Sequence, residues 1–135
     1  MAIELSYLVA AVLLFFVYIF AEVIAGNLQY SLKDLLGARD NLPEYNSAVG
    51  RAKRATSNML EAMIMFVPLV LVAQATNSFN SMTALGAAVF FWARAAYAPC
   101  YWFGIPVLRT LAWFVSLAGL AIIFLQVLPF TGAGS

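Results

Sequence analysis

The chain has 135 residues, of which 64% are hydrophobic and 10% are charged. An average soluble domain carries about 25% charged residues, and a soluble fold of this length has too little interior to hide so much apolar surface. The composition therefore indicates one integral membrane domain over residues 1–135. The net charge of +1 gives no case for a nucleic-acid partner. Histidine is absent and Cys100 is the single cysteine, which excludes an intramolecular disulfide and a cysteine-based zinc site, so we expect no metal.

Apolar runs predict four membrane-spanning helices, over residues 5–24, 59–75, 82–101 and 107–128. The first run has about the 20 residues that a spanning helix needs. No basic residue precedes it, so it predicts a retained helix and not a cleaved signal peptide. Each span must satisfy its own backbone hydrogen bonds in lipid. We therefore expect an all-α fold, an integral membrane four-helix bundle with up-down-up-down topology.

Cations are distributed unevenly between the connections. Five of the seven lysines and arginines lie between the first two spans, and none lies between the second and third. The positive-inside rule then predicts that the first and third loops are cytosolic and that both termini lie outside. Pro43 and the Asn46–Ser47 pair are typical of a helix start, so the second helix is expected to run unbroken from there to Ala75.

A polar stripe is expected on the second helix. Arg51, Arg54, Asn58 and Glu61 are spaced 3, 4 and 3 residues apart, which places them within about 80° of one helix face. A carboxylate near lipid costs a few kcal/mol unless it is paired. Two compatible interpretations stay open: Glu61 forms a structural ion pair with Arg54 or with a cation of a neighbouring helix, or the stripe binds a ligand. Lys53 lies off the stripe and is expected to be a solvated or headgroup-contacting cation.

The third helix carries a second polar stripe, with Arg94, Tyr97 and Tyr101 spaced 3 and 4 residues apart. Arg94 lies deep enough to need a partner or a water-filled cleft. Taken alone, the tyrosines are more typical of an interfacial aromatic belt. Pro106 suits the first turn of the fourth helix, which places Arg109 in that turn. A cation is mildly unfavourable there, but the free N–H groups of the same helix end suit an anion.

These polar groups all lie near the expected cytosolic ends of helices two, three and four. Arginines suit carboxylates, Asn58 suits an amide and Glu61 suits an ammonium group. The pattern therefore predicts a binding site for a small, charged, peptide-like ligand at the membrane edge. The lipid-facing side of the same cleft would admit an apolar co-substrate.

Two segments carry a resemblance to a known family. "RAKRATSNMLE" resembles the R-A-x-x-N-x-x-E motif on the second helix of the MAPEG family, the membrane-associated proteins in eicosanoid and glutathione metabolism. The matching residues are Arg54, Ala55, Asn58 and Glu61. "ARAAYAPCYWFGIPVLRT" resembles the family's arginine and tyrosines on helix three, followed by an arginine that opens helix four. The first loop, "GARDNLPEYNSAVGR", is similar to that of bacterial members, which implies a bacterial inner membrane.

The resemblance implies a homotrimer of four-helix protomers that binds glutathione as co-substrate in clefts between protomers, beside membrane lipid and a hydrophobic small-molecule substrate. Arg109 of the adjacent protomer would act catalytically by stabilising the glutathione thiolate, because a nearby guanidinium lowers the thiol pKa from about 8.5. The glutathione-binding residues would be Arg51, Arg54, Asn58, Glu61, Arg94, Tyr97 and Tyr101. Better-known members have a strongly basic end of helix one. Here that end has Glu22, which would pair with an arginine of a neighbouring helix or reach the interface.

Three functions stay open. The first is a glutathione-dependent transferase or peroxidase that acts on hydrophobic electrophiles. The second is a non-catalytic lipid-binding or scaffold member of the same family. The third is a small transporter or channel subunit. The polar set together with Arg109 favours the first. The fourth helix argues against the third, because between residues 111 and 128 it offers only Ser116 and Gln126 to line a path.

Overall fold

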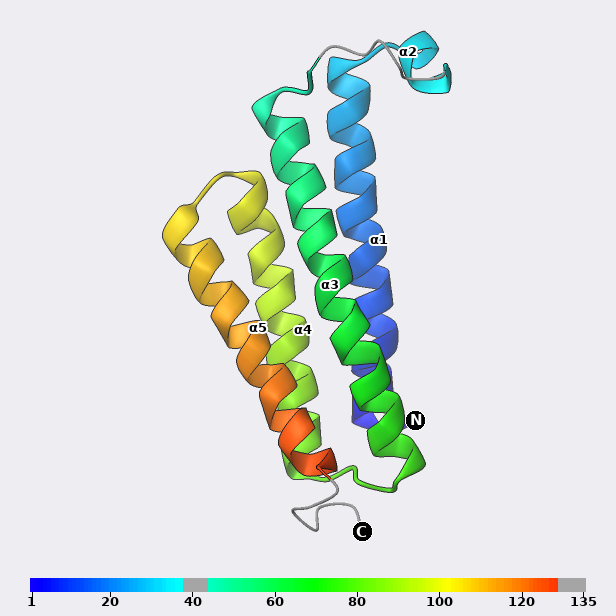
Figure 1. Cartoon of the computed structure of the whole chain (residues 1–135), viewed down its shortest axis with the longest axis vertical. Helices are drawn as coiled ribbons and strands as arrows, with labels where there is room; N and C mark the ends of the chain where they lie inside the picture. Colours follow the sequence, from blue (N-terminus) through cyan, green and yellow to red (C-terminus); the bar gives the residue numbers. More distant parts are fainter. Residues whose placement is uncertain (38–43, 129–135) are drawn as a thin grey trace.

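The computed structural model describes residues 1–37 and 44–128 (Figure 1). Within these ranges the secondary structure is helical, which confirms the all-α prediction. The helices are α1 (Ile3–Gln29), α2 (Leu32–Leu36), α3 (Ser47–Ala75), α4 (Ser81–Trp102) and α5 (Pro106–Val127). Three of the described helices, α1, α3 and α5, are long and apolar enough to cross a membrane. The third predicted span, over residues 82–101, corresponds to α4, which is not among them, so the four-span bundle stays a prediction.

The long helices run side by side along the longest axis of the molecule (Figure 1). α1 packs on α3, α4 packs on α5, and α4 also contacts both α1 and α3. The connection that contains α2 and the turn between α4 and α5 lie at one end of the molecule. The N-terminus and the connection between α3 and α4 lie at the other (Figure 1). The polar stripe of α3 lies towards the start of its helix, and the polar stripe of α4 lies towards the end of its helix. Both stripes therefore lie towards the end of the molecule that holds α2.

The predicted helix starts agree with the structure. The Asn46 side chain accepts a hydrogen bond from the Val49 N–H at 2.9 Å, which caps α3. α3 then continues to Ala75 although it contains Pro68. Pro106 occupies the first turn of α5, where its missing N–H costs no helical hydrogen bond. Pro43 lies outside the described residues.

Aromatic and small residues build the interior. Phe66 of α3 and Phe90 of α4 are fully buried and stack with their ring centroids 4.1 Å apart. α4 and α5 approach closely where Gly86 faces Gly119. A Cβ atom built on Gly119 would lie 2.7 Å from the Gly86 carbonyl oxygen and 2.7 Å from the Phe90 backbone nitrogen. Small residues allow such close backbone contact between membrane helices.

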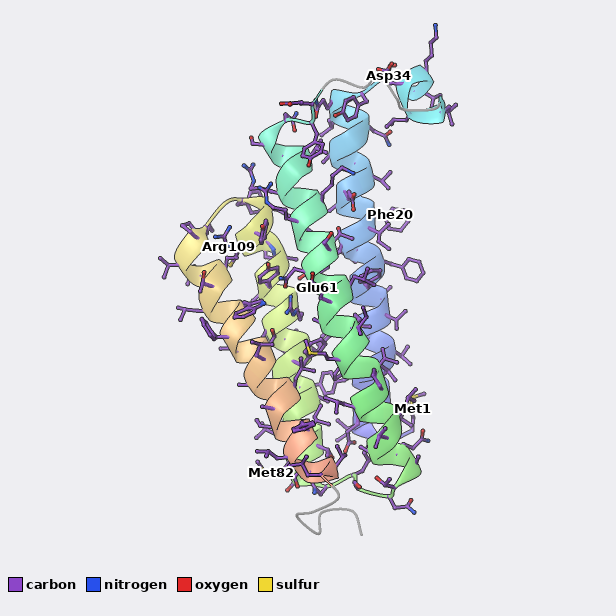
Figure 2. The ribbon with its side chains drawn as sticks, in the orientation of Figure 1. Met1, Phe20, Asp34, Glu61, Met82 and Arg109 are labelled. Atoms are coloured by element: carbon purple, nitrogen blue, oxygen red, sulfur yellow. The ribbon has the colours of Figure 1, made fainter. Side chains whose placement is uncertain are left out.

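The outward faces of α1, α3 and α5 are apolar. Exposed side chains on these faces include Leu13, Phe20, Ile64, Leu111 and Phe114, and Phe20 projects away from the helices in Figure 2. A soluble protein of this size would not expose so large an apolar surface. The surface suits lipid or other membrane-embedded helices.

A second polar group lies at the end that holds the N-terminus. The Glu4 side chain is only 5% exposed, and the Thr83 hydroxyl donates a hydrogen bond to its Oε2 at 2.5 Å. Asn80 caps α4 by accepting from the Thr83 N–H, and its Nδ2 donates to Gln126 Oε1 at 2.9 Å. These contacts tie the starts of α1 and α4 to the end of α5. The sequence pattern did not single out Glu4.

Candidate functional site

The stripes of α3 and α4 meet in the structure. Arg94 Nη1 donates a hydrogen bond to Asn58 Oδ1 at 2.6 Å, and Arg54 Nε donates to the Tyr101 hydroxyl at 3.1 Å. Arg51 Nε donates to the Trp102 carbonyl oxygen at 2.9 Å. That carbonyl belongs to the last turn of α4, where backbone oxygens lack helical partners. Side chains on three successive turns of α3 therefore contact the last turn of α4 and, about two turns earlier, Arg94.

Arg94 is the most enclosed of these residues, with an exposed fraction of 1%. Besides Asn58, its guanidinium contacts the rings of Tyr97 and Phe90, with Cζ 4.9 and 6.0 Å from the ring centroids. Its Nε has no hydrogen-bond partner among residues 1–37 and 44–128. Arg94 was expected to have either a partner or a water-filled cleft. The structure shows protein partners around it.

Tyr101 lies between two arginines. The Arg109 Cζ is 4.9 Å and the Arg54 Cζ is 5.9 Å from its ring centroid, and Tyr97 packs beside it at 5.4 Å. Such guanidinium–ring contacts are favourable and leave the guanidinium N–H groups free to bind an anion. Tyr97 is 3% exposed, so it does not belong to an exposed aromatic belt. Arg109 thus lies near the α3 and α4 stripes of its own chain, and its contribution to a neighbouring protomer stays a prediction.

Glu61 lies on the same stripe but faces outward. Its neighbours Leu60 and Ile64 are 51% and 65% exposed, and Figure 2 shows Glu61 midway along α3. Among the described residues, the salt bridge joins Lys53 to Glu22 and does not include Glu61. The structural interpretation, in which Glu61 pairs with Arg54 or with another cation of this bundle, is therefore not what the single chain shows.

The Lys53–Glu22 pair corrects the predicted partner of Glu22, which is a lysine of α3 and not an arginine. Lys53 Nζ lies 3.2 Å from Glu22 Oε1 and 5.8 Å from the ring centroid of Tyr45. The reason is geometric, because α1 and α3 pack side by side and bring Lys53 and Glu22 to the same level. The Lys53 side chain is 47% exposed, so it is still partly solvated, as expected.

Tyr18 is a contact of the site that the sequence pattern missed. It is fully buried on α1, and its hydroxyl donates a hydrogen bond to the Arg94 carbonyl oxygen at 2.7 Å. Its own carbonyl accepts from the Thr56 hydroxyl at 3.2 Å. The available clue was a tyrosine inside a strongly apolar helix, since a buried tyrosine hydroxyl usually needs a partner.

Two cavities lie away from these polar residues. One of about 610 Å³ lies between α1, α2 and the start of α3, with the Lys53–Glu22 pair on its wall. The other, of about 580 Å³, is an apolar groove between α3 and α5 that includes Pro68 and Phe124. Neither is lined by a predicted site residue. The polar cluster lies outside both cavities and is defined by its side-chain chemistry.

Comparison with known proteins agrees with this chemistry. The model of the MAPEG family matches residues 7–129. No curated protein and no solved structure matches the chain. The family match extends from α1 to the end of α5 and includes both polar stripes. The chain therefore belongs to the MAPEG family.

Proposed function

We propose that this protein is a glutathione-dependent membrane transferase or peroxidase that acts on hydrophobic electrophiles. The observation that carries the proposal is the meeting of Arg54, Asn58 and Arg94 with Tyr101 and Arg109 at one end of the molecule. These residues come from three helices. A charged cluster of this kind in a membrane domain is costly, which favours a function over a packing role.

The charges of the cluster complement those of glutathione. Glutathione has two carboxylates, one ammonium group, two amides and a thiol. Arg51 and Arg54 supply donors for carboxylates, and the exposed Glu61 carboxylate supplies a partner for the ammonium group. The ligand would thus be held by its charged ends, with its thiol directed towards Arg109.

Arg109 would then activate the sulfur. Its positive charge lowers the pKa of the bound thiol and increases the thiolate fraction. In the transferase reaction the thiolate attacks the electrophilic carbon, a carbon–sulfur bond forms, and the leaving group departs or the product takes up a proton. In the peroxidase reaction two glutathione molecules are oxidised to the disulfide while the hydroperoxide is reduced to an alcohol and water.

The exposed position of Glu61 supports an oligomer. An exposed carboxylate between Leu60 and Ile64 on a spanning helix costs a few kcal/mol if it faces lipid without a partner. A second copy that covers this face would supply a cation or enclose the ligand. We therefore propose the homotrimer of the family, in which Arg109, beside Tyr101 of its own chain, would also border a cleft shared with the adjacent protomer and reach the glutathione bound there.

We also propose that α4 spans the membrane, giving an up-down-up-down four-helix bundle. The connection containing α2 and the α4–α5 turn lie at the same end of the molecule (Figure 1). This arrangement suits an orientation in a bacterial inner membrane with both of these loops in the cytosol and both termini outside. The polar cluster would then face the cytosolic supply of glutathione.

A non-catalytic lipid-binding or scaffold role is the alternative. It is favoured by the bonds that Arg51 and Arg54 make within the chain, to the Trp102 carbonyl and the Tyr101 hydroxyl. Arginines held in this way can serve packing alone. Binding and kinetics separate the two roles.

The test is glutathione binding by calorimetry on detergent-purified protein, followed by turnover with a generic electrophile. We expect Arg109→Ala to lower kcat with a modest change in the KM for glutathione, because the thiolate is stabilised during reaction. We expect Glu61→Gln mainly to raise KM, because it weakens ground-state binding. Lys33→Ala is the matched control, since it removes a cation of α2 that lies outside the cluster. Full activity of a folded Arg109→Ala protein would refute the thiolate role, and absence of glutathione binding by the wild type would favour the scaffold role.

A further inference from the structure

Arg94 is too enclosed to be a direct ligand contact. Only 1% of its surface is exposed, its guanidinium lies against Tyr97, and its Nη1 is committed to Asn58. Asn58 is half-buried, so part of its side chain is accessible from outside the chain. We infer that Arg94 is a positioning residue that fixes the amide orientation of Asn58, and that Tyr18 holds Arg94 in place. This inference deepens the proposed function and rests on it.

The bond between Arg94 and Asn58 determines which amide atom is available. A guanidinium has only donors, so it can bond to the carbonyl oxygen of Asn58 but not to its NH2 group. Oδ1 must therefore face Arg94, and the orientation of the amide follows from the network. Asn58 Nδ2 makes no hydrogen bond within residues 1–37 and 44–128, so both of its hydrogens remain for a ligand. Asn58 would thus bind a carbonyl or carboxylate oxygen of the peptide and would not bind its ammonium group.

Tyr18 connects three helices beside this bond. Its hydroxyl donates to the Arg94 carbonyl oxygen at 2.7 Å, and its ring packs edge-on against Trp102 at 5.8 Å. Its carbonyl accepts from Thr56, which lies on α3 close to Asn58. A helical carbonyl oxygen has a second lone pair for such a bond. Tyr18 therefore holds α4 at the level of Arg94 relative to the α3 turn that carries Asn58.

Substitutions at Tyr18 separate positioning from general packing. Tyr18→Phe removes the hydroxyl and keeps the ring. We expect glutathione binding to weaken about fivefold, the effect of one net hydrogen bond, with KM raised and kcat at saturating glutathione unchanged. The matched control is Tyr7→Phe, which removes a hydroxyl on the same helix that bonds to Trp92 at 3.3 Å. Equal glutathione affinities for Tyr18→Phe, Tyr7→Phe and the wild type would overturn the role of Tyr18.

Asn58→Asp tests the donor. The aspartate keeps an oxygen for Arg94 but replaces the NH2 group by a second oxygen, which repels a ligand carboxylate. We expect at least about a tenfold loss of glutathione affinity together with a higher Tm, because Arg94 gains a countercharge. Unchanged affinity would overturn the assignment of Asn58 as a donor.

A ligand-independent measurement distinguishes this inference from the proposed function. In an Arg94→Met background, Asn58→Asp should lose its gain in Tm, because the aspartate no longer faces a guanidinium. If the wild type does not bind glutathione but this coupling appears, the proposed function fails and the Arg94–Asn58 geometry stands. If Asn58→Asp changes Tm equally in both backgrounds, Arg94 does not position Asn58 and the inference is overturned.

Discussion

Replacing Gly119 by alanine tests the close packing of α4 against α5. The added Cβ atom would lie 2.7 Å from two backbone atoms, the Gly86 oxygen and the Phe90 nitrogen. Neither atom can rotate away as a flexible side chain would. Relief requires the two helices to separate locally until the contacts lengthen from 2.7 Å to the 3.4 Å at which ordinary van der Waals contact begins.

The cost of this separation can be bounded from known effects. Inserting a group into a packed interior costs about 1–3 kcal/mol. The higher helix propensity of alanine over glycine returns about 1 kcal/mol. The neighbouring Phe66–Phe90 stack would also loosen, since Phe90 contributes the backbone nitrogen. Because both contacts are to backbone atoms, we place the packing cost in the upper half of its range, about 2–3 kcal/mol. We therefore expect a net loss of stability of about 1–2 kcal/mol, which lowers Tm by several degrees.

The assay is thermal unfolding of each variant in the same mild detergent, followed by size-exclusion chromatography. Gly26→Ala is the matched control, because Gly26 also lies in a helix but no atom lies within 4 Å of a Cβ built on it. We expect Gly26→Ala to be as stable as the wild type or more stable. If Gly119→Ala is as stable as Gly26→Ala, α4 and α5 do not pack in backbone contact at Gly119, and the prediction is refuted.

Two further predictions concern polar contacts. Thr83→Val should destabilise the protein by about 1–3 kcal/mol, because it leaves the buried Glu4 carboxylate without its hydroxyl donor. Thr110→Val is the control in the same thermal assay, since that exposed hydroxyl donates to the backbone of its own helix. An equal effect of both variants would contradict the prediction. Lys53→Met should change stability by no more than about 1 kcal/mol, because its pair with Glu22 is partly exposed and screened by solvent; a larger loss that disappears at high salt would show that the pair matters more than its exposure suggests.

Residue spacing was sufficient to predict the four long helices and to group the polar residues near one end of the molecule, but it did not predict the short helix α2. A hydrophobic run and a capping residue are local features, so the start of α3 at Asn46 and of α5 at Pro106 could be read from the sequence. The polar stripes could be recognised because helical periodicity places residues three and four apart on one face. The sequence predicted that Arg54 and Tyr101 lie near the same end of the molecule, but it did not predict the hydrogen bond between them.

Contacts between helices at matching depth could not be read in the same way. Tyr18, Glu4 and the partner of Lys53 depend on the relative rotation and vertical offset of packed helices. A shift of one residue turns a helix by about 100° and moves it by about 1.5 Å, which changes every such partner. Whether the Arg94 side chain points into the bundle depends on the same rotation and offset. The spacing therefore identified the polar residues that are energetically unfavourable in a membrane domain. The packing of the helices determined which partner each of these residues contacts.

The stacked rings of Phe66 and Phe90 also determine what the membrane can retain. They lie between the Arg94 cluster and the Glu4–Thr83 contact, which are 11 residues apart along α4, or about 16 Å. Because both rings are fully buried against each other, water entering at one end meets a dry segment before it can reach the other. Ions and protons would have to cross this segment without hydration. The proposed reaction at one surface would therefore leave the electrochemical gradient of the membrane intact.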